Sequence, residues 1–266
     1  MDTHTPHGDT ADELLAIFDR QLRKNALPDG PRATVERAAR VVRQVGPGPV
    51  WNGILWSDLT ADTADAEIAA QARHFAFLGQ ECEWKLYAHD RPADLGQRLR
   101  AAGFEAEPEE TVMVARVADL PLDVAPADGV TLCPVTDEAG VDLMAHVHDR
   151  AFGNDGSGFR ARLLAQFAEA PETVTAVVAM AGDTPVSAAR MDFHPGTDFA
   201  SLWGGGTLPE WRGKGIYRAL IAYRARIAAE RGYRYLQVDG SDQSRPILRR
   251  LGFTPLTVTT PYLRKP

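Results

Sequence analysis

The hydrophobic pattern of this chain switches repeatedly between the period of a helix and that of a strand. Residues 11–24 place five apolar side chains on one face and therefore predict a helix. Similar patterns predict helices at about 62–78, 92–102, 137–152, 159–169, 216–230 and 244–251. Shorter apolar runs predict strands at about 41–45, 50–56, 83–88, 111–117, 130–133, 174–180, 185–193, 200–207, 235–238 and 256–263. This succession predicts an α/β fold with a mixed sheet.

A proline-rich, acidic segment at residues 118–129 interrupts the pattern near the middle of the chain and predicts a linker. At 266 residues the chain is long enough for two domains of ordinary size. We therefore expect a tail and helix in residues 1–29, a first domain in 30–118, the linker in 119–127 and a second domain in 128–266.

A basic, glycine-rich turn, residues 208–220, lies between a predicted strand and a predicted helix. Free backbone N–H groups and the helix dipole attract anions at such a turn, and an arginine and a lysine add full positive charges. The turn therefore predicts a phosphate site. A Walker loop is excluded, because Leu208 and Gly215 stand where a glycine and a hydroxyl residue belong. Arg218 likewise breaks the dinucleotide fingerprint.

The spacing Arg212-x-x-Gly215-x-Tyr217 resembles the Arg-x-x-Gly-x-Gly/Ala pyrophosphate loop of the GNAT acyltransferases, with a tyrosine in the last position. The predicted element order after residue 128 is also that of the GNAT fold. This resemblance implies transfer of an acyl group, usually from acetyl-CoA, to an amine of a small molecule or a peptide. It also implies a set of CoA-binding residues at the strand end and in the loop: Thr207, Leu208, Arg212, Gly213, Lys214, Gly215, Ile216 and Tyr217.

The strand before the loop contains three consecutive glycines, residues 204–206. Glycines in a strand permit a bulge and the close approach of another chain. In GNAT enzymes, which this region resembles, the pantetheine arm of CoA lies between two splayed parallel strands at such a place. A tight bend without any ligand explains the same glycines.

The two halves of the chain show a faint internal repeat. A shift of 149 residues superposes the helix end at 99–104 on that at 248–253 and lays Asp90 on Asp239 without a gap. The same shift places residues 63–66, Thr-Ala-Asp-Ala, opposite the basic loop. Acidic side chains at a helix N-terminus suit the helix dipole but repel a pyrophosphate. We therefore expect a tandem GNAT protein whose degenerate N-terminal copy does not bind CoA.

Two groups that assist acyl transfer in GNAT enzymes are missing from this sequence. By motif position, Ser241 replaces an asparagine that contacts CoA, and Leu248 replaces a tyrosine that protonates the thiolate. Ser241 is a candidate hydrogen-bond partner of the sulfur, although a serine before a helix is also a common N-cap. The missing tyrosine leaves a non-catalytic acyl-CoA-binding module as an alternative function, and binding of another phosphate ligand is a third hypothesis.

An amine with a pKa near 10.4 needs a base or a desolvated site to react at neutral pH. Strand alternation puts Arg190, Asp192 and His194 on one face of a predicted hairpin strand. Asp192 or His194 is a candidate base if that face lines the acceptor site, whereas a solvated edge explains the same pattern. Asp239 is a third candidate, for which its match to Asp90 favours a structural role.

The composition limits which binding partners and which cellular location we expect for this protein. The net charge of −7 argues against nucleic acid, because backbone phosphates require a positive surface. No apolar run has the length of a membrane span or the character of a signal peptide, so we expect no membrane contact and a cytoplasmic enzyme. Cys82 and Cys133, like His146 and His148, lack metal-ligand spacing, so no metal is expected. We expect a monomer or a homodimer.

Overall fold

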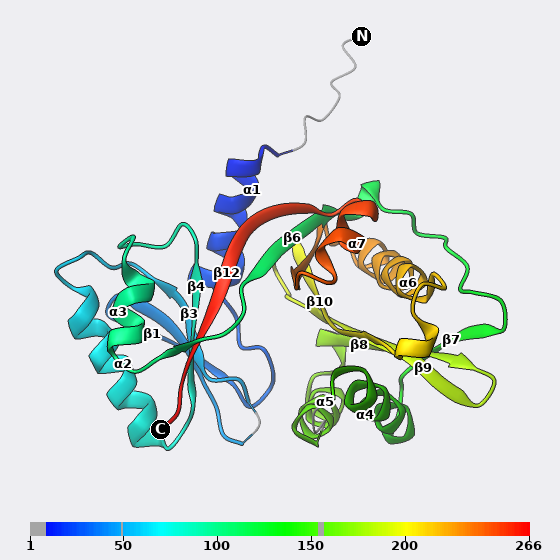
Figure 1. The fold of residues 1–266 in the computed structure, drawn as a ribbon, viewed down its shortest axis with the longest axis horizontal. Helices are drawn as coiled ribbons and strands as arrows, with labels where there is room; N and C mark the ends of the chain where they lie inside the picture. The colour runs from blue at the N-terminus through cyan, green and yellow to red at the C-terminus, as the bar shows by residue number, and fades with distance from the viewer. Residues whose placement is uncertain (1–8, 49, 154–156) are drawn as a thin grey trace, which may run out of the picture.

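The computed structural model describes residues 9–48, 50–153 and 157–266, which form two lobes (Figure 1). The predicted tail, residues 1–8, lies outside the described residues. The first half of the chain contains α1 (Ala11–Phe18), η1 (Asp19–Lys24), β1 (Thr34–Ala38), β2 (Val41–Val45), β3 (Gly53–Ser57), α2 (Ala64–Leu78), β4 (Cys82–Tyr87), α3 (Leu95–Ala101), β5 (Glu105–Ala106), β6 (Glu110–Arg116) and η2 (Val117–Asp119). The second half contains β7 (Val130–Pro134), α4 (Glu138–Phe152), α5 (Ser157–Glu169), η3 (Pro171–Thr173), β8 (Val174–Ala181), β9 (Thr184–Phe193), β10 (Phe199–Thr207), η4 (Pro209–Trp211), α6 (Ile216–Glu230), β11 (Tyr235–Gly240), α7 (Arg245–Arg250) and β12 (Thr254–Arg264).

The helix predicted over residues 11–24 is confirmed and begins with a capping box. The Thr10 hydroxyl accepts the N–H of Glu13 at 3.3 Å, and the Glu13 carboxylate accepts the N–H of Thr10 at 2.8 Å. The helix changes to π-helical geometry at Asp19 and ends at Lys24. Its buried Phe18 packs with Tyr87 and other aromatic side chains near the centre of the molecule. This packing joins the N-terminal helix to the lobes.

Twelve strands of the described chain form one sheet in the order β1-β2-β3-β4-β12-β6-β11-β10-β9-β8-β7, with β5 beside β12. The centre of this sheet is built by strand exchange. β12 lies between β4 and β6 of the first half, and β6 lies between β12 and β11 of the second half. Figure 1 shows β6 and β12 running from one lobe to the other. Each half of the chain thus ends in a strand that lies among strands of the other half.

The gap-free repeat of 149 residues does not hold in the structure. Helices α2 and α6 begin at Ala64 and Ile216, a separation of 152 residues. Asp239 lies inside β11, whereas Asp90 follows the end of β4 and is not its structural counterpart. The order strand, helix, strand, helix, strand is shared from β3 to β6 and from β10 to β12, apart from the two-residue β5.

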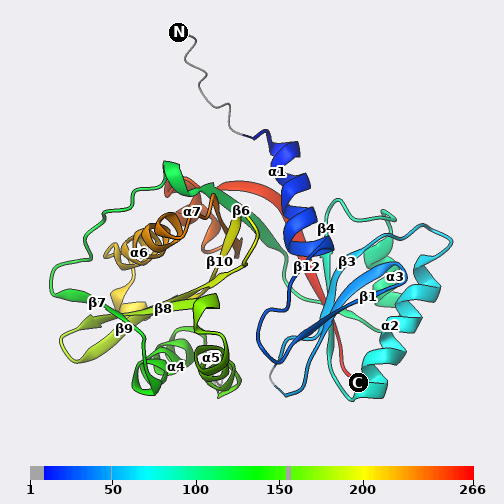
Figure 2. The ribbon, with the colours of Figure 1, turned by 180° about the vertical axis from the view of Figure 1, so that it is seen from behind.

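Helices cover both faces of the sheet in the second lobe (Figure 2). On one face, α6 packs Ile221 and Ala225 against Leu202 of β10 and Leu236 of β11. On the other face, α4 and α5 pack against β8 and β9. In the first lobe, α2 and α3 lie on the outer side of β3 and β4 (Figure 1). Strands β10 and β11 are therefore held in place by α6 on one side. On the other side, α4 contacts the end of β10, and Lys85 of the first lobe pairs with Asp239 of β11.

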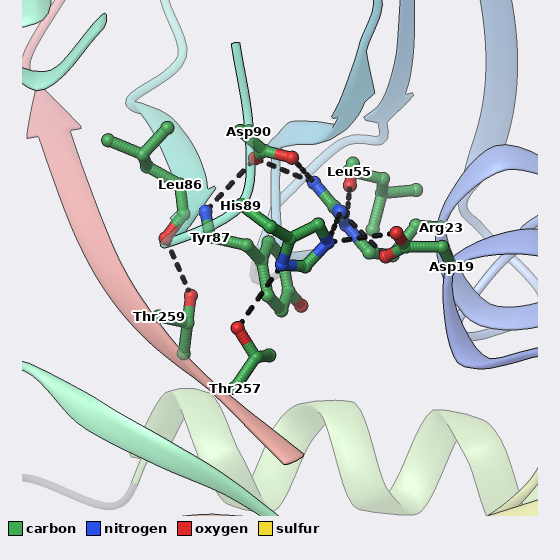
Figure 3. Close-up of polar contacts among 9 residues, drawn as sticks. All are labelled: Asp19, Arg23, Leu55, Leu86, Tyr87, His89, Asp90, Thr257 and Thr259. Carbon is green, nitrogen blue, oxygen red and sulfur yellow. Dashed lines mark hydrogen bonds and ion pairs between the residues drawn. The ribbon is translucent and has the colours of Figure 1, made fainter. Parts of the chain in front are cut away.

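A buried arginine in η1, Arg23, binds residues in and directly after β4. The Arg23 side chain is 2% exposed, and its Nη2 donates to both carboxylate oxygens of Asp90 at 2.7 Å. Its Nη1 donates to Asp19 at 2.7 Å and its Nε to the carbonyl of Leu55 at 3.1 Å (Figure 3). The guanidinium carbon also lies 3.8 Å from the centre of the Tyr87 ring. One cation therefore satisfies two carboxylates in a buried site.

Replacing Arg23 by Met is expected to lower the free energy of unfolding by about 3 kcal/mol, because two carboxylates lose their shared cation in a buried site. Urea unfolding followed by circular dichroism measures the change. Arg20→Met, at an exposed arginine of the same helix, is the control and should change the free energy of unfolding by less than about 0.5 kcal/mol. A loss in Arg23→Met no larger than that of the control contradicts the role given to Arg23.

Candidate active site

The parallel strands β10 and β11 separate just before the basic loop. Three residue pairs join them at their start, from Phe199 opposite Tyr235 to Ser201 opposite Gln237. Farther along, β10 remains paired with β9 up to Thr207, and β11 remains paired with β6 up to Gly240. The facing backbone edges of the two strands are thus unpaired over their second halves. An extended ligand that pairs with backbone needs such an edge.

Strand β10 carries a bulge at the same level. Its pairing with β9 shifts register between Trp203 and Gly206, and Gly204 has a φ of 58°. Glycine is favoured at this left-handed conformation. A bulge releases backbone N–H groups from the ladder, and groups of this kind stabilise the negative charge that develops on a carbonyl oxygen during acyl transfer.

The basic loop follows directly and presents unpaired backbone to solvent. Gly213 and Gly215 have φ values of 77° and 79°, which an L side chain adopts only with strain. The Arg212 Nε donates to the carbonyl of Thr207 at 3.1 Å and so closes the loop onto the end of β10. Residues 212–215 are exposed, and the first N–H groups of α6 have no intrahelical partner. This geometry suits a phosphate or pyrophosphate.

Tyr217, the last residue of the loop motif, lies against the bulge. A Cβ atom added at Gly205 would be 2.9 Å from the Tyr217 Cε2, so the ring and the glycine are in direct contact. The ring packs on the apolar cluster beneath α6, and burial raises the pKa of its hydroxyl. Tyr217 thus covers the α6 side of the separated strands, where the GNAT motif has a small residue.

Thr207 and Leu208, the two strand-end residues expected to contact pantetheine, differ in the hydrogen bonds that their backbone groups make. Leu208 donates its N–H to Val186 at 3.0 Å and accepts from Trp211 at 2.9 Å, so both of its backbone groups are already used within the protein. The contact of Leu208 with pantetheine stays a prediction. Backbone groups alternate in direction along a strand, so the N–H of Thr207 points away from β9 and toward β11. Thr207 keeps its place as a candidate donor.

Arg190 and Asp192 lie on one face of β9, as the alternation predicts, and form an ion pair of 3.2 Å. Their side chains are 7% and 14% exposed, so this face is not a solvated edge. Helix α5 covers it, and the ring centre of Phe159 lies 5.8 Å from the guanidinium carbon of Arg190. Asp192 therefore lies in a partly enclosed region beside β10.

His194 is the first member of a hydrogen-bonded chain. Its Nε2 contacts the Ser201 hydroxyl at 2.7 Å, Ser201 donates to Gln237 at 2.8 Å, and Gln237 donates to Asp239 at 2.7 Å. Because Ser201 gives its proton to Gln237, the network assigns a proton to the His194 Nε2. Burial lowers the pKa of His194, so the ring is neutral at pH 7. The side-chain amide of Gln237 does not relay a proton between Ser201 and Asp239. His194 therefore acts in this network as a hydrogen-bond donor.

Asp239 forms a buried ion pair with Lys85, which the first lobe contributes from β4. One of its oxygens accepts from Gln237 and the other from Lys85. Two bound oxygens support the structural role favoured for Asp239. The ion pair also brings the first lobe to the face of β11 that lies opposite α6.

Glu110, the first residue of β6, was not singled out by the sequence. Val112 lies opposite Asp239 in the β6–β11 register, so Glu110, two residues earlier, shares a face with Asp239. Burial and the charge of Asp239 raise the pKa of Glu110. Among the described residues, no hydrogen bond to the Glu110 carboxylate forms. A free carboxylate with a raised pKa on β6, across β11 from the open strand edge, is a candidate general base.

Ser241 and Leu248 lie in and after the loop that follows β11. The Ser241 hydroxyl accepts from the N–H of Ser244 at 3.4 Å at the entrance to α7 and is exposed. Leu248 is buried in the core under α6, so the tyrosine position of the GNAT motif provides packing and no proton. The hydroxyl of Ser241 is thus partly used by the protein and still open to solvent.

The corresponding turn of the first lobe is closed by an ion pair. Asp65, in the first turn of α2, binds Arg98 at 2.9 Å, and Arg98 also donates to the carbonyl of Ala61 at 3.1 Å. Glu67 adds a second negative charge to the same turn. The N-terminus of α2 therefore lacks the free, positively charged backbone that the basic loop presents.

The bulge, the open edge and the loop lie in one segment of the chain. Residues 141–253 match the acetyltransferase (GNAT) family. The matched segment begins in α4 and ends after α7, so it includes β10, the basic loop, α6 and β11. The family uses acetyl-CoA, and the loop residues present fit its pyrophosphate.

Solved structures extend the likeness in fold to nearly the whole chain. A GCN5-related N-acetyltransferase from Kribbella flavida is 20% identical, with a TM-score of 0.67 over 98% of this chain and 97% of its own. A functionally unknown protein from Staphylococcus epidermidis is 18% identical, with a TM-score of 0.66 over 91% and 96%. A tandem GNAT protein from the clavulanic acid biosynthesis pathway is 14% identical, with a TM-score of 0.63 over 96% and 94%. These likenesses confirm the α/β fold with a mixed sheet, and a search among curated proteins gave no match.

Two further features concern membranes and metals. None of the helices within residues 9–48, 50–153 and 157–266 is long and apolar enough to span a bilayer. In the same residues, no three His, Cys, Asp or Glu side chains gather in the way a metal ion requires.

Proposed function

We propose that this protein is an acyl-CoA-dependent N-acyltransferase that moves an acetyl group from acetyl-CoA to an amine of a small molecule or peptide. The observation that carries the proposal is the unpaired edge between β10 and β11, which leads directly into the glycine loop at the start of α6. The loop would hold the pyrophosphate through its N–H groups, Arg212 and Lys214. The unpaired edge, including Thr207, would hold the pantetheine arm as an added strand.

Acyl transfer in this site is direct attack of the amine on the thioester within a ternary complex. The bulge at Gly204–206 supplies backbone donors for the carbonyl oxygen as it gains negative charge. Loss of the amine proton costs about 4 to 5 kcal/mol at pH 7 for an amine of pKa near 10.4, which a nearby base lowers. We assign that role to Glu110, because burial and Asp239 raise its pKa, whereas Asp192 is held in an ion pair with Arg190.

The thiolate leaving group needs less help. A thiol has a pKa near 8.5, so its anion departs without obligatory protonation. The exposed hydroxyl of Ser241 is the proposed hydrogen-bond donor to the sulfur. Because protonation of the thiolate is not obligatory, acyl transfer is possible with Leu248 in place of the family's tyrosine.

The first lobe is proposed to shape the acceptor side of the site. It contributes Lys85 and Glu110 next to Asp239, and its own α2 turn is closed by the Asp65–Arg98 ion pair. We infer that CoA binds the second half of the chain alone. Titration with CoA followed by calorimetry should therefore give one site per chain.

The proposed function is tested by following release of free CoA from acetyl-CoA with a thiol reagent while amines are screened. Release that depends on an added amine, with formation of the acetylated amine seen by mass spectrometry, supports the proposal. Measurable CoA binding without release for any amine supports the non-catalytic module instead, which the buried Leu248 favours. A thermal shift with ATP or NAD but not with CoA supports the other-phosphate hypothesis.

A further inference from the structure

Buried polar atoms without a partner are concentrated beside the bulge. Of the eight such side-chain atoms in the described chain, five belong to four residues that lie together. They are the His148 Nδ1, the Arg162 Nε, the Arg190 Nε and Nη1, and the Asp192 Oδ1. Unmade hydrogen bonds of this kind are costly in a folded protein, and a bound ligand is a common reason for them. We call these four residues, His148, Arg162, Arg190 and Asp192, the α5–β9 polar cluster.

The α5–β9 polar cluster is a single electrostatic unit built from three elements. Arg190 and Asp192 come from β9, Arg162 from α5 and His148 from α4. Burial and the neighbouring charge of Arg190 lower the pKa of Arg162. Burial lowers the pKa of His148. The charge of Asp149 raises this pKa in part, and the charges of Arg190 and Arg162 lower it further, so the ring is neutral at pH 7.

The α5–β9 polar cluster has more unpartnered donors than acceptors. Its charges balance, because the carboxylate of Asp29 also interacts with Arg162 and Arg190, so two guanidinium groups face two carboxylates. One oxygen of Asp29 accepts from Gln44 at 2.6 Å, and three guanidinium N–H groups of the cluster still lack an acceptor, against one free oxygen of Asp192. Guanidinium N–H groups are suited to the two oxygens of a carboxylate.

The cluster adjoins the place of acyl transfer. Arg190 lies opposite Trp203 in the β9–β10 register, one residue before Gly204. A Cβ atom added at Gly204 would be 3.9 Å from the ring of Phe159, which in turn stacks on His148 with ring centres 5.0 Å apart. A molecule held by the cluster therefore lies next to the bulge on the face opposite α6.

We propose that the α5–β9 polar cluster binds the carboxylate of the acyl acceptor, so that the acceptor is an amine that also carries a carboxylate, such as an amino acid. This inference rests on the proposed acyltransferase function. The Arg190 Nε and Nη1 and the Arg162 Nε donate to the carboxylate. The Asp192 Oδ1 accepts an N–H or O–H of the same molecule, and Asp192 holds the Arg190 guanidinium through its other oxygen.

The test compares acceptors that differ only in the carboxylate. L-alanine, L-phenylalanine, L-glutamate and L-lysine are each assayed against their amides by CoA release, with ethanolamine phosphate as a second kind of anion. We expect kcat/KM for the best carboxylate to exceed that of its amide at least tenfold, since a hydrogen bond to a charged group is lost in the amide. Arg162→Met should reduce this preference to less than about threefold. Arg160→Met, at an arginine of the same helix that binds Glu138 and Asp142 on the surface, should keep it.

Binding is measured in parallel, so that the result does not depend on catalysis. The same compounds are titrated by thermal shift in the presence of CoA, with the wild type and both arginine variants. Carboxylates that raise the melting temperature of the wild type and of Arg160→Met, but not of Arg162→Met, support the proposal even if no acceptor is acetylated. That result would count against the proposed function alone. Amides that bind and react as well as the acids, a preference for ethanolamine phosphate, or no binding by any carboxylate would overturn the proposal.

Discussion

Arg212→Glu combined with Gly215→Asp is expected to abolish CoA binding while leaving the fold intact. The change converts one positive charge of the loop to negative and adds a second negative charge at the N-cap of α6, where the helix dipole and the loop N–H groups would meet the pyrophosphate. Both positions are exposed, and a side chain at Gly215 meets nothing within 4 Å. Calorimetric titration with CoA should show at least a hundredfold loss of affinity, and circular dichroism should show an unchanged spectrum.

A matched control separates this local effect from the general cost of the two substitutions. Arg226→Glu with Gly232→Asp makes the same charge changes at the far end of α6, at an exposed arginine and at a glycine with a φ of 78° and open space around it. This control should bind CoA as the wild type does. Unchanged CoA affinity in Arg212→Glu/Gly215→Asp would show that the loop is not the pyrophosphate site.

Glu110→Gln is expected to lower kcat about 100- to 10,000-fold, the range typical for loss of a general base, with little change in CoA affinity. In the wild type, Glu110 must be deprotonated to accept the amine proton. Because burial and Asp239 raise its pKa, activity should fall as the pH drops through a value above the usual glutamate range. A pH profile of kcat/KM should show this acidic limb in the wild type and lack it in Glu110→Gln.

The adjacent exposed residue provides the control for this experiment. Glu109→Gln removes the same charge one position earlier, where the side chain points into solvent, and should keep both the rate and the acidic limb. A rate within about threefold of the wild type for Glu110→Gln would move the base assignment to Asp192. Loss of kcat without loss of the acidic limb would mean that Glu110 supports the site in another way.

Most of the fold could be predicted from local patterns. The helices predicted over 11–24 and 62–78 and the hairpin strands predicted near 174–193 have the periodicity of their structures, and the structure contains these elements. Strand β1, by contrast, has the polar sequence Thr34–Ala38 and lies at the edge of the sheet, so it lacks the apolar signal of a strand. The exchange of β6 and β12 was also not predicted, because alternation reveals a strand but not its partner.

A local pattern also does not reveal which distant residues lie together, and this explains which residues of the site could be predicted from the sequence. The glycine loop is local, so Arg212, Gly213 and Gly215 could be recognised from their spacing alone. Glu110 follows an acidic, proline-containing stretch that is typical of a solvated loop, and only the β6–β11 pairing places it beside Asp239. The sequence also does not indicate that Arg162 is buried or part of a site. An arginine on a helix is usually a surface residue, and the burial of Arg162 depends on the packing of α5.

The strand order also has a consequence for synthesis of the protein. Strand β12 follows every other strand in the chain, so β4 and β6 leave the ribosome before the strand that will lie between them has been made. Until then, both strands have an open edge, and β11 has only an incomplete sheet to join. We therefore expect the nascent first half to depend on protection from aggregation. Entry of β12 completes the centre of the sheet and brings Lys85, Glu110 and Asp239 together in the last step of folding.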